Sequence, residues 1–314
     1  MGDHFSSIRF LLISALIVMV GVIVASMVGM GIQEESKGMA KPTLIFLWLF
    51  TSTGKLFSFI QFIGFFGPLI GIILGFDSIN RERVSRTLSK LVSQPIYRDS
   101  IINAKFLGGA TIIGIVLAAI ILIISGLGIR LIGVVPGSEE VLRLAIYLVI
   151  SILYISFWLG ISILFSVIFR STATSALASL AVWIFFSFFV SLGAGVLSDA
   201  IAPINQSQSS ATVNIDAVIQ HERIQRVISH FSPMTLYSDA TSLILNPMNQ
   251  TTRPLAYALM GPLERLSISR FQSPLPIIQS LYIVAPYLIS IVAITFLCFG
   301  ICYAVFMRQE IRTI

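Results

Sequence analysis

Charged residues are scarce in this chain. Only 11% of its 314 residues are Asp, Glu, Lys or Arg, whereas hydrophobic residues make up 56% and the mean hydropathy is +0.94. A soluble domain carries about 25% charged residues. The composition therefore excludes a soluble protein and predicts an integral membrane protein. The net charge of +6 does not indicate nucleic-acid binding, because the basic residues form no patch with interleaved aromatics.

Cysteine and catalytic motifs are also scarce. The two cysteines, Cys298 and Cys302, lie four apart in an apolar run, where we expect them to pack as small hydrophobic side chains. "HERIQ" has Gln225 where a zinc-protease helix has its second histidine, and "STGKLFS" has Leu56 where a P-loop has Ser or Thr. We expect no catalytic residue, no metal site and no cofactor in this chain.

Long apolar runs are abundant. A helix that spans about 30 Å of hydrocarbon at about 1.5 Å per residue needs about 20 apolar residues. Six runs meet this length, so the sequence predicts an all-α membrane protein with six transmembrane helices in a single domain, 1–314. We expect the shorter run 43–50 to lie at the membrane interface or to extend the second helix outward. The six expected spans are 10–32, 56–76, 101–128, 143–169, 173–198 and 280–307.

The basic residues indicate how the chain is oriented. With both termini in the cytoplasm, ten basic residues lie in the short inner segments and five lie in the short outer loops. Cytoplasmic loops carry the excess of Lys and Arg. We therefore expect cytoplasmic termini, a cytoplasmic segment at 77–100 and a large extracytoplasmic segment at 199–279.

The extracytoplasmic segment contains two helical patterns. Apolar residues recur with helical spacing over 214–231, which predicts an amphipathic helix that lies on the membrane or caps the bundle. A turn and a second short helix follow over 231–247, ending at Asn246-Pro247.

The apolar cores of the expected spans contain no ionisable residue. Ion-coupled transporters and proton pumps keep such residues in their spans, so this chain must take any driving energy from elsewhere. Glycines spaced three or four apart in the second span would allow close helix packing. They are Gly64, Gly67, Gly71 and Gly75.

Charge is concentrated in one connection, "GFDSINRERVSRTLSKLVSQPIYRDS", residues 75–100. Ile79, Val84, Leu88, Leu91 and Val92 fall on or near one face of a short predicted helix, which Gln94-Pro95 ends. Asp99 is well placed to begin the third span. A basic loop that touches anionic lipid headgroups is the alternative, but it does not explain Glu82, the apolar face or the proline.

This stretch resembles the type-2 permease family of ABC transporters, the exporter-type, NosY-like membrane subunits. The resemblance rests on Gly75-Phe76-Asp77, Glu82, Thr87-Leu88, the run 91–96, Arg98 and Lys105, together with the six expected spans. Arg86 departs from the pattern, because the family has glycine there. The segment before the first span is also too short for the long amphipathic helix of many members.

The resemblance implies that residues 79–93 form a coupling helix that docks on a separate ATPase. That ATPase would bind the ATP and magnesium, because this chain has no Walker sequence. A complete exporter would contain two ATPase subunits and a second permease half, identical or related, in the plasma membrane of a prokaryote and in contact with its lipids. The expected ATPase contacts are Ile79, Glu82, Arg83, Thr87, Leu88, Leu91, Pro95 and Arg98.

Two other classes of protein compete with this interpretation. A polytopic membrane enzyme would need convergent reactive side chains at membrane depth, and the sequence shows no such group. A permease-like scaffold or mechanotransmission subunit, which does not itself carry a solute, stays open as the alternative.

Overall fold

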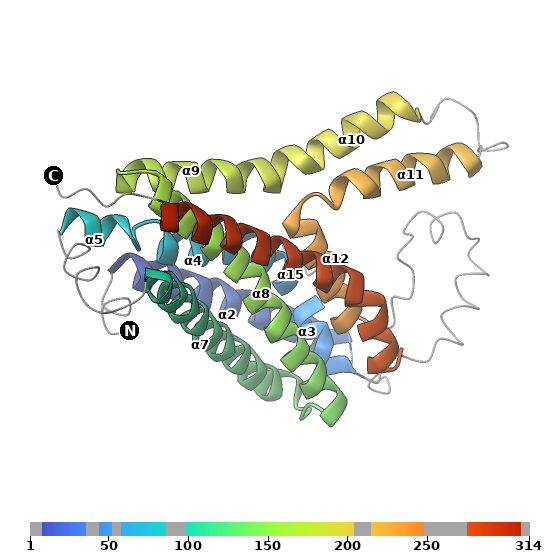
Figure 1. The fold of residues 1–314 in the computed structure, drawn as a ribbon. Coiled ribbons are helices and arrows are strands. Elements are labelled where there is room, and N and C mark those ends of the chain that lie inside the picture. The colour runs from blue at the N-terminus through green and yellow to red at the C-terminus, as the bar shows by residue number, and fades with distance from the viewer. Residues whose placement is uncertain are drawn as a thin grey trace.

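The computed structural model describes residues 8–35, 44–51, 58–85, 98–203, 215–247 and 275–308. Every regular element in these ranges is helical, which confirms the all-α class (Figure 1). By length and composition, five stretches of helix are apolar enough to cross a membrane. They are Phe59–Val84, Asp99–Ile132, Ser138–Ile168, Thr172–Ile201 and Ile277–Arg308, and they match the second to sixth expected spans.

The first expected span falls in helix α2, Ile8–Glu35, which has 28 residues. Within it, Ile17–Met30 is a shorter apolar helical stretch. A helix of 28 residues is about 42 Å long. Among its described residues the structure thus has five helical stretches that are long and apolar enough to cross a membrane, and the crossing by α2 is part of the proposal below.

Helix α8, Ser138–Ile168, lies at the centre of the bundle and packs against α4 (Phe59–Gly75), α7 (Arg98–Ile132) and α15 (Ile277–Arg308). Three glycines of the expected face of α4 form the contact with α8, namely Gly67, Gly71 and Gly75, while Gly64 meets Tyr237. A Cβ atom at Gly71 would lie 2.7 Å from the Ile155 carbonyl oxygen, and one at Gly75 would lie 2.7 Å from Ser162 Cβ. The two helices approach this closely because these glycines have no side chain.

The short run 43–50 packs into the bundle in its described part. Its described part forms a 3-10 turn, η1 (Ile45–Leu47), and the short helix α3 (Trp48–Thr51). Phe46, Leu47, Leu49 and Phe50 are all buried in the core. The place of this run at the membrane interface stays a prediction. Its burial could not be foreseen, because nothing local to the run shows that other helices cover it.

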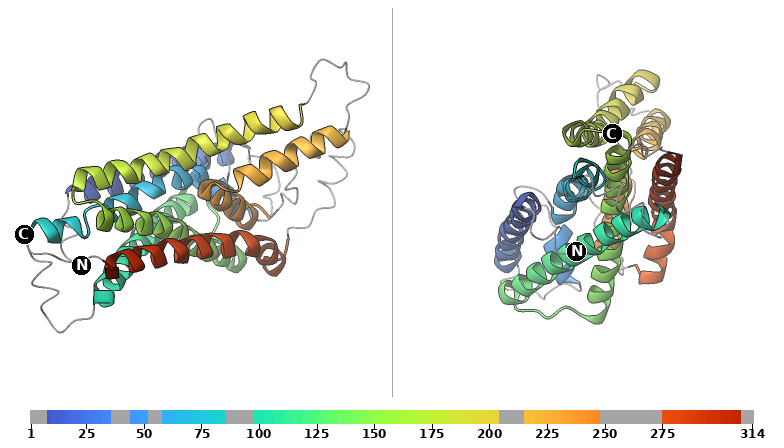
Figure 2. Two further views of the ribbon diagram at one scale, coloured as in Figure 1. Left: turned by 45° about the horizontal axis from the view of Figure 1, so that its top comes forward. Right: turned by 60° about the vertical axis from the view of Figure 1, so that its left-hand side comes forward.

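The fifth span is one long helical stretch with a change of pitch. Helix α9 (Thr172–Ile184) packs on α8, a π-helical turn follows at Phe185–Phe189, and α10 (Val190–Ile201) packs on α11. Figure 2 shows α10 and α11 side by side along one flank of the bundle.

Both helices expected in the extracytoplasmic segment are present, as α11 (Ile215–Ser229) and α12 (Pro233–Leu245), with Asn246 following α12 as predicted. Helix α11 packs along α10, with Val218 buried and Val227 exposed. Helix α12 is instead surrounded by α4, α8 and α15, and its Tyr237, Ala240 and Ile244 are fully buried. The second short helix is thus part of the core.

Candidate functional site

The charged connection begins at a joint between α4 and the short helix α5, Asn80–Val84. We define the joint as Phe76–Asn80. The backbone N–H groups of Ile79 and Asn80 both donate to the Ser166 hydroxyl of α8, over 3.1 and 3.2 Å. A side chain of α8 thus holds the first turn of α5 against the bundle.

The apolar residues at the two ends of α5, Ile79 before its first residue and Val84 at its last, lie in opposite environments. Ile79 is fully buried in the core, whereas Val84 is 73% exposed. The expected shared face is therefore wrong at these two positions, because the joint turns Ile79 inward. Ile79 presents no surface to a partner in this structure and acts as an anchor for α5. Arg81 and Val84 are the exposed side chains of the helix.

Charged side chains of α5 reach two neighbouring helices. Glu82 forms an ion pair with Lys105 of α7. Arg83 donates to the backbone carbonyls of Val167 and Phe169, at the end of α8, over 3.4 and 3.5 Å. A cation is favourable at the carbonyl end of a helix. Any displacement of α5 therefore acts directly on α7 and α8.

Four of the expected contact residues, Thr87, Leu88, Leu91 and Pro95, lie outside the described residues. Arg98 is the first residue of α7, and Asp99 lies in its first turn, as the sequence predicts. Of the expected contact residues, the structure places Ile79 in the joint and Glu82 and Arg83 in the helix that follows it.

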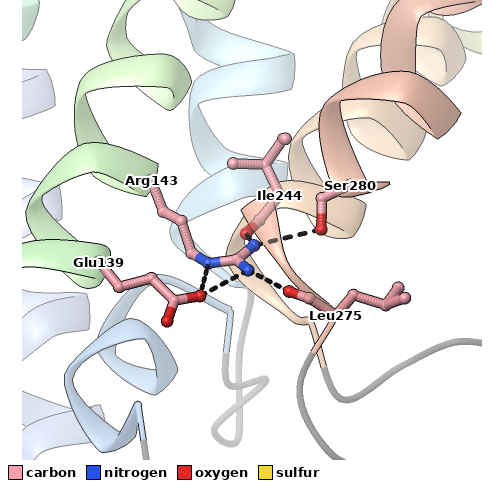
Figure 3. A network of polar contacts seen from close by, with 5 residues as sticks. All are labelled: Glu139, Arg143, Ile244, Leu275 and Ser280. Carbon is pink, nitrogen blue, oxygen red and sulfur yellow. Dashed lines mark hydrogen bonds and ion pairs between the residues drawn. The ribbon is translucent and has the colours of Figure 1, made fainter. Parts of the chain in front are cut away.

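A second polar site surrounds Arg143 near the start of α8 (Figure 3). The Arg143 side chain is fully buried. Its guanidinium donates twice to the Glu139 carboxylate, to the carbonyls of Ile244 and Leu275, and to the Ser280 hydroxyl. These groups belong to α8, the end of α12 and the start of α15. We call this set the arginine hub.

Glu140 performs a related role one residue after Glu139. One carboxylate oxygen accepts from the Gly137 backbone at 2.8 Å, which caps α8, and the other accepts from the Phe46 backbone at 3.0 Å. The carboxylate thus ties the buried η1 turn to the start of α8, at the same end of the bundle as the arginine hub.

Buried hydroxyl groups connect α8 with α12 and α4 in the middle of the bundle. Tyr237 of α12 lies 3.0 Å from the Ser151 hydroxyl and donates to the Tyr147 hydroxyl over 3.2 Å. Tyr154 stacks on Tyr237 with ring centroids 4.4 Å apart and donates to the Gly64 carbonyl of α4 over 2.7 Å. These bonds satisfy polar groups where water is excluded.

The sequence model of the ABC-2 family transporter proteins matches residues 1–311. The chain belongs to this family. It therefore has the role of an ABC permease, a membrane transport subunit. Members of the family are generally not catalytic themselves and in general associate with an ABC ATPase. No curated protein matches the chain.

The sequence interpretation of this ABC-2 permease missed the arginine hub, Glu140 and the role of Ser166. It counted Arg143 among the residues of an outer loop. The sequence did contain a signal for the pairing of Arg143. Glu139 and Glu140 precede it by four and three residues, and side chains at these spacings are neighbours on a helix. The carbonyl acceptors on α12 and α15 could not be found this way, because they lie more than 100 residues along the chain.

Proposed function

We propose that the protein is the membrane-spanning permease subunit of an ATP-driven exporter, in which the segment 77–100 docks on a separate ATPase. The observation that carries this proposal is the joint, taken together with the family match over residues 1–311. Helix α5 exposes Arg81 and Val84, while Glu82 and Arg83 bind α7 and the end of α8. An ATPase that binds α5 and moves it would therefore move α7 and α8.

The proposed topology has six spans, α2 included, with both termini in the cytoplasm. Figure 1 shows α5, the start of α7 and the end of α15 at one end of the bundle, and α3 and the start of α8 at the other. The excess of basic residues favours the first end as the cytoplasmic one. Single cysteines at the exposed positions Ser138 and Ser100 test this. An impermeant maleimide should label Ser138→Cys in intact cells and should not label Ser100→Cys.

In the proposed mechanism the partner binds ATP and magnesium, and this chain transmits the motion. Ile79 anchors α5 from inside the bundle, and Glu82 and Arg83 link α5 to α7 and α8. Apart from Ile79, which is buried, the partner contacts expected from the resemblance stay as proposed: Glu82, Arg83, Thr87, Leu88, Leu91, Pro95 and Arg98.

A complete exporter would contain two ATPases and a second permease half, identical or related. The flank formed by α9 to α10 would face lipid or the second half. Its large exposed side chains need lipid or protein to cover them. They are Leu177, Ile184, Phe185, Phe188, Phe189, Leu192, Val196, Leu197 and Ile201.

Coexpression tests the docking directly. The tagged chain is purified together with each ATP-binding-cassette subunit of the source genome that lacks its own membrane domain. We expect one of them to copurify, and Leu88→Asp to abolish this, because an unpaired carboxylate in a dry contact costs several kcal/mol. Val135→Asp is the control, since Val135 is exposed in the loop between α7 and α8. If Leu88→Asp and wild type copurify equally, the segment is a basic loop at the lipid surface.

A further inference from the structure

The joint interrupts a helix that could be continuous. In an uninterrupted α-helix, the N–H of Ile79 would donate to the carbonyl of Gly75 and the N–H of Asn80 to that of Phe76. Here both N–H groups donate to the Ser166 hydroxyl instead, and the Gly75 carbonyl accepts from Ser78, over 3.1 Å. A side chain that inserts into the backbone ladder is a recognised cause of a helix break.

Two buried polar side chains at the joint have no hydrogen-bond partner among the described residues. Asn80 is fully buried and Ser78 is 6% exposed. Neither the Asn80 amide nor the Ser78 hydroxyl makes a hydrogen bond in the part of the chain that the structure describes. Buried polar groups are normally hydrogen-bonded, and leaving them unsatisfied raises the free energy of the state that contains them. The interrupted helix is therefore held at a cost.

We propose that the joint is a two-state element, in which the Ser166 hydroxyl holds the interrupted state and α4 and α5 form one continuous helix, Phe59–Val84, in the other. The number of hydrogen bonds made by the two amides is the same in both states. In the interrupted state the N–H groups of Ile79 and Asn80 donate to the Ser166 hydroxyl, and in the continuous helix they would donate to two backbone carbonyls of α4 and the joint. Ser166 is then a positioning residue that sets the direction of α5.

This inference deepens the proposed function and rests on it for the role of the ATPase. A partner shifts such an equilibrium only if it binds one state better than the other. Re-forming the backbone ladder would turn α5 relative to α7 and α8. The Glu82–Lys105 ion pair and the bonds from Arg83 to the end of α8 would then have to rearrange. An ATPase that prefers one direction of α5 would thus select the state of both spanning helices.

Distance measurement between spin labels tests the two states. Val84 and Val135 are 73% and 74% exposed, at opposite ends of the bundle, and each is changed to cysteine in a protein whose Cys298 and Cys302 are alanine. We expect one main distance for the wild type in nanodiscs. Ser166→Ala should add a second distance, and nucleotide added to the wild-type complex with its ATPase should populate that same second distance.

Two further variants make the test specific. Ser162→Ala is the matched control, because Ser162 lies one turn earlier on α8 and bonds the Ile72 carbonyl of α4 without touching the joint amides. It should leave the wild-type distance unchanged. Asn80→Leu removes the unpartnered amide and should favour the interrupted state. We expect a higher unfolding temperature and a smaller nucleotide-dependent population at the second distance.

The outcomes separate this inference from the proposed function. A wild-type distance in Ser166→Ala, both with and without nucleotide, overturns the two-state joint while the copurification of the ATPase is unaffected. Failure of every ATPase to copurify overturns the proposed function, yet the comparison of Ser166→Ala with Ser162→Ala in the permease alone still decides whether the joint has two states.

Discussion

The inner and outer spanning helices have the same hydropathy but different surroundings. The most apolar windows of Phe59–Val84 and Ser138–Ile168 have mean hydropathies of 2.1 and 2.4, and 72% and 67% of their residues are buried. The windows of Thr172–Ile201 and Ile277–Arg308 have hydropathies of 2.2 and 2.5, yet only 11% and 17% are buried. Hydropathy identifies a helix that can enter the membrane, but not what covers it.

The residue types at the helix contacts explain the difference. The inner pair, α4 and α8, meets through glycines and through hydroxyl groups that bond across the contact, such as Ser162 to the Ile72 carbonyl over 2.8 Å. Lipid is as apolar as leucine, so close packing and hydrogen bonds drive helix association in a bilayer. The outer helices expose large apolar side chains such as Phe189 and Phe296.

Loss of the arginine hub should have the largest effect. Arg143→Ala leaves the Glu139 carboxylate and the carbonyls of Ile244 and Leu275 without their donor. A buried acceptor that loses its donor costs about 1–3 kcal/mol, and several are lost here, so we expect a large fall in the unfolding temperature in detergent. Arg130→Ala, at an exposed position of α7, should leave the temperature unchanged. Equal effects of the two variants would contradict the hub.

Adding one methyl group should separate the inner from the outer helices. Gly71→Ala would force α4 away from α8, because its Cβ would lie 2.7 Å from a backbone oxygen. Such overpacking costs about 1–3 kcal/mol. Gly193→Ala on α10 meets nothing within 4 Å and should stabilise its helix by about 0.5–1 kcal/mol. The unfolding temperatures of the two variants measure this difference between the inner and outer helices. Destabilisation by Gly193→Ala would show that another chain or helix covers α10.

Removing a single hydroxyl should have a smaller effect. Tyr237→Phe keeps the stacking on Tyr154 but loses the contacts with Ser151 and Tyr147. We expect a loss of about 1 kcal/mol in the free energy of unfolding. Tyr282→Phe is the outer counterpart, since Tyr282 is 83% exposed on α15, and its unfolding should match that of the wild type. A neutral Tyr237→Phe would exclude a stabilising role for the hydroxyl cluster.

The smallest expected effect is a pH dependence in the middle of α12. Burial raises the pKa of Asp239, although His230, 3.1 Å away, and Arg226 act in the opposite direction. The folded carboxyl group thus holds its proton more tightly than the unfolded one. Its contribution favours folding at low pH and is lost as the pH rises through the raised pKa. Asp239→Asn should therefore flatten the unfolding temperature between acidic and neutral pH, and an unchanged profile would contradict this role.

The extent of the helices could be predicted from the sequence to within a few residues. The expected spans 173–198 and 280–307 correspond to Thr172–Ile201 and Ile277–Arg308. The starts of α7 and α8 were placed too late, at 101 and 143 instead of Arg98 and Ser138. The reason is that charged residues lie in the first turns of these helices, where apolar runs cannot include them.

The burial of particular side chains could not be predicted, because it depends on partners far along the chain. The sequence predicts that Ile79 belongs to the apolar face of the coupling helix. In the structure its backbone N–H donates to the Ser166 hydroxyl, 87 residues away, and its side chain is buried in the core. Glu140 gave no sign that it would bind the backbone of Phe46, 94 residues earlier. The candidate site was therefore predicted as a segment, and its internal contacts were found only in the structure.

Photo-crosslinking from α5 tests the central claim most directly. A photoreactive amino acid replaces Val84 in one variant and Phe189 in another, since both side chains are exposed, one at the joint and one on the outer flank. Each variant is irradiated in membranes that contain the copurifying ATPase. The account predicts a crosslink to the ATPase from position 84 and none from position 189. A crosslink from position 84 only to lipid, with the ATPase present, would contradict it.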